Sequence, residues 1–86
     1  MAFNATMVPI DATLITPSDT QFIAPFFLYI GGAGNVTVLP KAQESSPNPT
    51  PVTYTSVPAG TYLFVQVCKV LQTGTNATNI IGHGPT

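Results

Sequence analysis

The apolar residues of this chain occur in short runs that Gly, Pro, Asn and Thr positions separate from one another. Nine Pro and seven Gly in 86 residues oppose helix nearly everywhere, whereas the β-branched Thr that recurs along the chain suits a pleated strand. The pattern predicts strands at residues 26–30, 36–39, 52–57, 61–72 and 76–81.

Turn residues indicate how these strands connect. The glycines between residues 31 and 35 predict that the strands 26–30 and 36–39 form a hairpin with a glycine loop. Pro58 and Gly60 occupy the second and fourth positions of a type I turn before the longest strand. Residues 41–51 contain three prolines and two of the charged residues, so we expect an exposed loop there.

The longest predicted strand, residues 61–72, is apolar on both of its faces. Alternation places Leu63, Val65, Val67 and Leu71 on one face and Tyr62, Phe64, Cys68 and Val70 on the other. A strand covered on both sides lies between two layers of a domain or between a domain and its neighbour in an oligomer.

Irregular segments flank the strands at both ends of the sequence. Residues 1–13 predict an extended N-terminal arm, residues 14–81 a β-domain, and residues 82–86 a C-terminal tail without a packing residue. The predicted fold class is all-β: a small single-domain antiparallel β-sandwich or barrel of five to six short strands with an extended N-terminal arm.

The chain has very few charges for a small domain. Only 6% of its residues are charged, against 44% that are hydrophobic, whereas about a quarter is usual for soluble domains. The longest apolar run, at residues 22–30, is far shorter than the roughly 20 residues of a spanning helix, which argues against a membrane. With two Lys and no Arg, nothing neutralises phosphates, which argues against nucleic acid. We therefore expect a protein assembly to cover much of the surface.

No catalytic, cofactor-binding or metal-binding constellation is visible, so the sequence predicts no enzyme. The one histidine, His83, is expected to be a solvated tail residue, and Cys68 a small buried hydrophobe. Seven aromatic residues are assigned to core or subunit-interface packing, with a sugar-stacking platform as the alternative: Phe22, Phe26, Phe27, Tyr29, Tyr54, Tyr62 and Phe64.

Four segments, in this order and spacing, resemble a known family: residues 15–20 (ITPSDT), 28–38 (LYIGGAGNVTV), 57–63 (VPAGTYL) and 70–80 (VLQTGTNATNI). They are similar to the small head-spike base proteins of tailed bacteriophages and gene transfer agents, over roughly residues 14–81. The chain departs from these relatives at Gln66, Cys68 and Lys69, where they often carry basic residues, and in adding residues 82–86.

The resemblance implies a virion structural protein that is made in the host bacterial cytoplasm. A ring of copies, with a pentamer favoured, would sit at a capsid vertex as the base for a head spike or fibre. The implied partners are further copies of this chain, the major capsid protein and a spike or fibre protein. The chain's apolar arm and long strand suit such a ring. The residues expected at subunit or capsid contacts are Phe3, Met7, Val8, Ile10, Tyr62 and Phe64.

Three other functions stay open at this stage. A capsid decoration (cement) protein and a neck or tail adaptor are the viral alternatives, and copy number separates them from a vertex base. The non-viral alternative is a small carbohydrate-binding β-module, which predicts exposed aromatic residues and a measurable sugar affinity.

Overall fold

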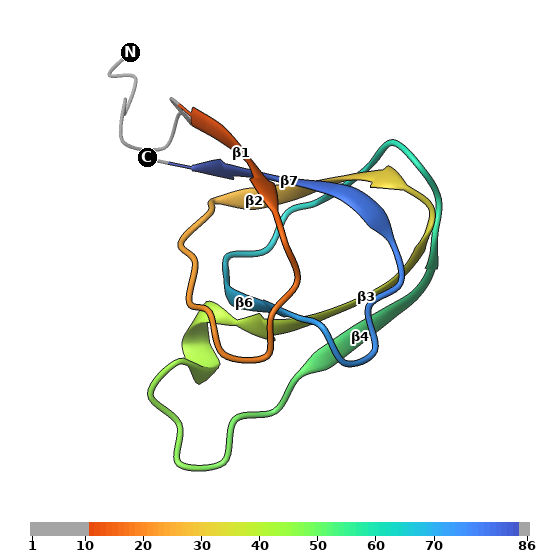
Figure 1. Cartoon of the computed structure of the whole chain (residues 1–86). Helices are drawn as coiled ribbons and strands as arrows, with labels where there is room; N and C mark the ends of the chain where they lie inside the picture. Colours follow the sequence, from red (N-terminus) through yellow and green to blue (C-terminus); the bar gives the residue numbers. More distant parts are fainter. Residues whose placement is uncertain (1–10, 85–86) are drawn as a thin grey trace.

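Two antiparallel β-sheets packed face to face make up the fold of residues 11–84, the part of the chain that the computed structural model describes (Figure 1). The seven strands are β1 (Asp11–Ile15), β2 (Phe27–Gly32), β3 (Gly34–Pro40), β4 (Val52–Val57), β5 (Thr61–Leu63), β6 (Val67–Leu71) and β7 (Thr78–Gly84), with a short 3-10 helix, η2 (Lys41–Gln43), after β3. The predicted all-β antiparallel sandwich is confirmed, with seven strands in this part of the chain rather than five or six. None of its helices is long and apolar enough to cross a membrane.

The strands divide into a four-stranded sheet with the order β1-β7-β2-β5 and a three-stranded sheet with the order β4-β3-β6. From β2 onward the chain changes sheet at every connection except the one from β3 to β4. Residues far apart in the sequence are therefore neighbours, as in the pairing of β1 with β7.

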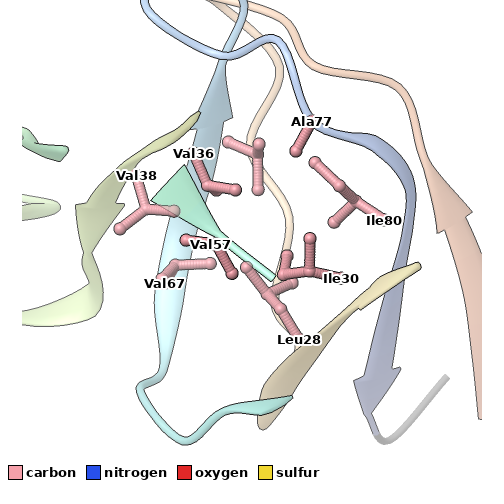
Figure 2. Packing of buried hydrophobic residues seen from close by; sticks show 9 residues of the cluster. Leu28, Ile30, Val36, Val38, Val57, Val67, Ala77 and Ile80 are labelled. Carbon is pink, nitrogen blue, oxygen red and sulfur yellow. The ribbon is translucent and has the colours of Figure 1, made fainter. Parts of the chain in front are cut away.

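The core between the sheets is aliphatic (Figure 2). Alternation along β2 turns Leu28 and Ile30 inward, where both side chains are fully buried, and the three-stranded sheet contributes mainly valines. The buried cluster consists of Leu28, Ile30, Val36, Val38, Val57, Val67, Val70, Ala77 and Ile80. Of the aromatic side chains that the structure describes, none belongs to this cluster, so these rings lie at its margins or outside.

The predicted hairpin between residues 26–30 and 36–39 is wrong, although both strands exist. The chain leaves the four-stranded sheet at Ala33, and β3 enters the other sheet. At the crossing, Gly34 has a φ of +155°, and a Cβ there would lie 2.5 Å from Asn76 Oδ1. Gly34 therefore allows the chain to pass close to the loop between β6 and β7 instead of forming a two-strand turn.

The predicted single long strand is also wrong, because the chain changes sheet between β5 and β6. Leu63 pairs with Leu28 in one sheet, whereas Val70 pairs with Val38 in the other. The apolar run at residues 61–72 therefore forms two short strands, the first in the four-stranded sheet and the second in the three-stranded sheet.

Both ends of the expected β-domain extend further than the sequence suggested. Residues 11–13 pair with β7 as part of β1, and β7 continues to Gly84, so residues 82–84 are strand and not tail. Residues 1–10 and 85–86 lie outside the described residues, and for them the assignment as arm and tail stays a prediction.

Asn35 and Asp19 fasten loops to the sandwich. Asn35 Oδ1 accepts a hydrogen bond from the Ser56 backbone N–H at 2.9 Å, and the Asn35 N–H donates to Asn76 Oδ1 at 2.6 Å. The Asp19 carboxylate accepts hydrogen bonds from the Thr73 N–H at 3.0 Å and the Thr73 hydroxyl at 2.8 Å. These bonds lower the pKa of Asp19 below its model-compound value of 3.8.

Truncating the core should cost far more stability than truncating an exposed strand residue. Leu28 is fully buried, so we expect Leu28→Ala to lower the free energy of unfolding by about 2–5 kcal/mol. The matched control is Val52→Ala on β4, because Val52 is 41% exposed; its expected cost is below about 1 kcal/mol. Chemical denaturation followed by circular dichroism measures both, and equal losses would contradict the assignment of the core.

The two hydrogen bonds from Thr73 to the Asp19 carboxylate, which we call the Asp19 clamp, should make the free energy of unfolding depend on pH. Because the folded pKa lies below the unfolded value, the clamp contributes stability above pH 3.8 and loses it as the pH falls through the folded pKa. The difference in unfolding free energy between wild type and Asp19→Ala should therefore be present near neutral pH and vanish in acid. Thr73→Val, which keeps the N–H donor but lacks the hydroxyl, should show a smaller pH-dependent loss. A difference that is constant with pH would exclude this role.

Candidate functional site

Among residues 11–84, the outer surface of the four-stranded sheet carries most of the large exposed apolar side chains. Because Leu28 and Ile30 point into the core, Phe27 and Tyr29 point to the opposite side of β2. Cross-strand partners share a face of a sheet, so the register extends this surface over all four strands.

Two rows of side chains cross the sheet. In the first row, Tyr29 pairs with Tyr62 of β5 on one side and with Ile81 of β7 on the other, and Ile81 pairs with Leu14 of β1. In the second row, Phe27 pairs with His83 of β7, and Phe64 directly follows β5 beside it. We call this surface the aromatic face and define it by Leu14, Phe27, Tyr29, Tyr62, Phe64, Ile81 and His83.

The rings of the aromatic face pack against one another. The Phe27 ring lies 4.9 Å from the His83 ring, nearly parallel to it, and 5.4 Å from the Phe64 ring. The Tyr62 ring lies 5.0 Å from the Tyr29 ring and 5.9 Å from the Phe64 ring. Such ring contacts add to the burial energy of the side chains and hold the surface in one shape.

The aromatic face remains open to solvent. Leu14 is 62% exposed, Tyr62 48% and Phe64 80%. None of its members is Asp, Glu, Lys or Arg. Asp11 pairs with Gly84, one position away from the row that contains His83, and so faces the other side of the sheet. A contiguous, exposed apolar surface without acidic, Lys or Arg side chains is typical of interaction sites in proteins that are otherwise well packed.

The residues predicted at contacts are placed as follows. Tyr62 and Phe64 lie on the aromatic face and are exposed, and their contact role stays a prediction. The arm residues Phe3, Met7, Val8 and Ile10 lie outside the described residues. Sequence reasoning missed Leu14, Ile81 and His83, because only the register of β1 and β7 brings them beside the aromatic rings.

His83 is not the solvated tail residue that the sequence suggested. It belongs to β7 and stacks on Phe27. The flanking glycines look like turn residues, but a Cβ at Gly82 would lie 3.0 Å from the Ile15 side chain and 3.3 Å from Pro25. They are therefore sites where a loop packs closely on the inner side of the strand.

Cys68 and the cavity beside the four-stranded sheet have structural explanations and do not indicate a catalytic or ligand site. Cys68 is fully buried, as predicted, and burial raises the pKa of its thiol. A cavity of about 190 Å³ lies on the inner side of the four-stranded sheet and is lined by Thr13, Ile15, Ile23, Ala24, Pro25, Gly82 and Gly84. Its volume is below the roughly 300–1,000 Å³ of small-molecule sites. Among residues 11–84, no three His, Cys, Asp or Glu side chains gather as metal ligands would.

The chain folds as a small β-sandwich with an open aromatic face, and a comparison with solved structures gives the family. The chain is similar to a chain in the capsid of a native gene transfer agent (GTA) particle, computed with C5 symmetry, with a TM-score of 0.75 and 30% sequence identity. The match covers 95% of this chain and 90% of that chain. No family model matches the sequence, and no curated protein matches it. The chain belongs to the same family as this chain of the GTA capsid.

The aromatic face should be dispensable for folding. Phe64 is 80% exposed, so Phe64→Thr removes little buried area, and we expect the free energy of unfolding to change by less than about 1 kcal/mol. Denaturation at concentrations too low for association measures this change. A loss as large as that of Leu28→Ala would mean that Phe64 belongs to the core.

Proposed function

We propose that this chain is a structural protein of a phage-like particle. It forms a ring of copies, most simply a pentamer, at the capsid vertices, as the base on which a head spike or fibre stands. The observation that carries the proposal is the match, over nearly the whole of both chains, to a chain of the GTA capsid.

The composition and surface of the chain support an assembled state. A protein with 6% charged residues and an uncharged aromatic face is poorly suited to remain a dispersed monomer. Covering the aromatic face in an assembly removes apolar surface from water, which is the main driving force of association. This role needs no catalytic group.

A ring of five copies is compatible with the symmetry of the related particle. The GTA capsid of the related chain was computed with C5 symmetry, which a ring of five copies around that axis would obey. In such a ring each copy presents one surface to the next copy and a different surface to the previous one. The aromatic face supplies one of the two surfaces.

The proposed partners follow from this position. Tyr62 and Phe64 contact ring neighbours, and the arm residues Phe3, Met7, Val8 and Ile10 reach a neighbouring copy or the major capsid protein. The outer rim of the ring receives the spike or fibre. The protein is made in the host bacterial cytoplasm and resides on the capsid surface of the virion.

Carbohydrate binding is the second candidate function, and one observation favours it. The rings of Tyr62 and Phe64 are exposed and nearly parallel, with 15° between their planes, as sugar-stacking rings often are. Sugar sites also need polar side chains for the sugar hydroxyls, and the aromatic face offers only tyrosine hydroxyls and His83. The assembly role therefore has more support.

The location of the chain in the particle tests the proposal. In a reconstruction of particles that lack this chain, we expect density to be missing at the fivefold vertices while the shell stays intact. Restoring the wild-type chain should restore the density. Density lost over the whole shell would instead identify a decoration protein, and density lost only at the portal would identify a neck or tail adaptor.

A further inference from the structure

The aromatic face has no partner among the described residues, although its side chains are already ordered by contacts with one another. Phe64, its most exposed ring, is 80% exposed yet lies 5.4 Å from Phe27 and 5.9 Å from Tyr62. A surface fixed in this way loses little side-chain freedom when a partner covers it. The partner should be apolar and uncharged, as the face is.

The chain itself contains a segment with this chemistry. Residues 1–10 (MAFNATMVPI) have no charged side chain and include five large apolar ones, Met1, Phe3, Met7, Val8 and Ile10. The segment lies outside the described residues and precedes β1. Ten extended residues span up to about 33–36 Å, enough to reach a neighbouring copy.

The register of the sheet places the start of β1, where residues 1–10 join it, next to the aromatic face. Asp11, the first residue of β1, pairs with Gly84, and Ala12 pairs with His83. His83 stands in the same row as Phe27 and Phe64. The first described residue, Asp11, thus lies on the edge strand of the four-stranded sheet, next to the second row of the face.

We infer that residues 1–10 of each copy dock on the aromatic face of the next copy. This inference rests on the proposed ring and specifies its contact. An arm that binds a different surface of its neighbour makes a head-to-tail contact, and contacts of this type form a ring when the rotation from copy to copy closes after a whole number of copies. A face that docks on an identical face would instead stop at a dimer.

Mixing two defective full-length variants tests this arrangement. The arm variant carries Phe3→Ser, Met7→Ser, Val8→Ser and Ile10→Ser, and the face variant carries Tyr62→Thr and Phe64→Thr. Matched controls are Asn4→Ser with Thr6→Ser in the arm, and Val52→Thr, an exposed apolar position of the other sheet. Sedimentation velocity and native mass spectrometry report the assemblies, and circular dichroism verifies the fold. If the arm variant does not fold, Phe3→Ser alone replaces it.

Wild type and both controls should form the same ring. Each defective variant alone should associate at least about 30-fold more weakly, as expected for the loss of a hot-spot contact. An equimolar mixture should recover a heterodimer, because the intact arm of the face variant meets the intact face of the arm variant. A wild-type monomer, an unaffected variant, or a mixture without the heterodimer would each overturn the inference. The last result is the one expected if the arm folds onto the face of its own copy or the face docks on itself.

The result can be separated from that of the proposed function. Vertex rings that still form with the face variant would overturn the arm contact and leave the vertex role intact. Arm-to-face rings in solution, combined with density at the portal in particles, would do the reverse.

Discussion

The packing of leucine, isoleucine and valine side chains between the two sheets is the interaction on which the rest of the structure depends. A domain of this size has a small core, and the sheets can approach closely only because the inward residues are compact. Large rings at those positions would force the sheets apart. Successive side chains of β2 point to opposite faces of the sheet, so the compact Leu28 and Ile30 lie inside and the larger Phe27 and Tyr29 lie outside.

The aromatic rings lie on the outer side of the four-stranded sheet, where a partner can contact them. A soluble monomer of this fold would normally carry charged residues on the outer face of its four-stranded sheet. Here that face has aromatic and aliphatic side chains on all four strands, and its rings support one another. In the proposed ring, the core and the contact between copies thus use opposite sides of the same strands. Substitutions on the outer side should then change assembly without changing the fold.

The local pattern of the sequence predicted strands better than it predicted their partners. Residues 52–57 form the expected strand, and the runs around Phe27 and Val36 are strands as well. Composition and alternation are local properties, whereas the choice of sheet depends on contacts between distant segments. Three features depend on such contacts. The chain crosses between sheets at Ala33, where the glycines suggest a hairpin, and it changes sheet after Leu63, where the apolar run suggests one long strand. β7 continues through His83, where the glycines suggest a tail.

Part of the aromatic face could be predicted from the sequence, because that part also depends on local patterns. Tyr62 and Phe64 share one side of an apolar run, which predicts a contact for them, whereas the sequence predicts core or subunit-interface packing for Phe27 and Tyr29, with sugar stacking as the alternative. Leu14, Ile81 and His83 joined them only through the pairing of β1 and β7, strands more than 60 residues apart in the sequence. No pattern within either segment carries that information.

In the proposed assembly the aromatic face is covered, and hydroxyl-radical footprinting of intact particles tests this most directly. In the isolated fold, Phe64 is 80% exposed and Phe22, which lies away from the aromatic face beside Lys69, is 50% exposed. The account predicts that within particles Phe64 is oxidised more slowly than Phe22. Oxidation of Phe64 at least as fast as that of Phe22 would show that the face is open and would contradict the account.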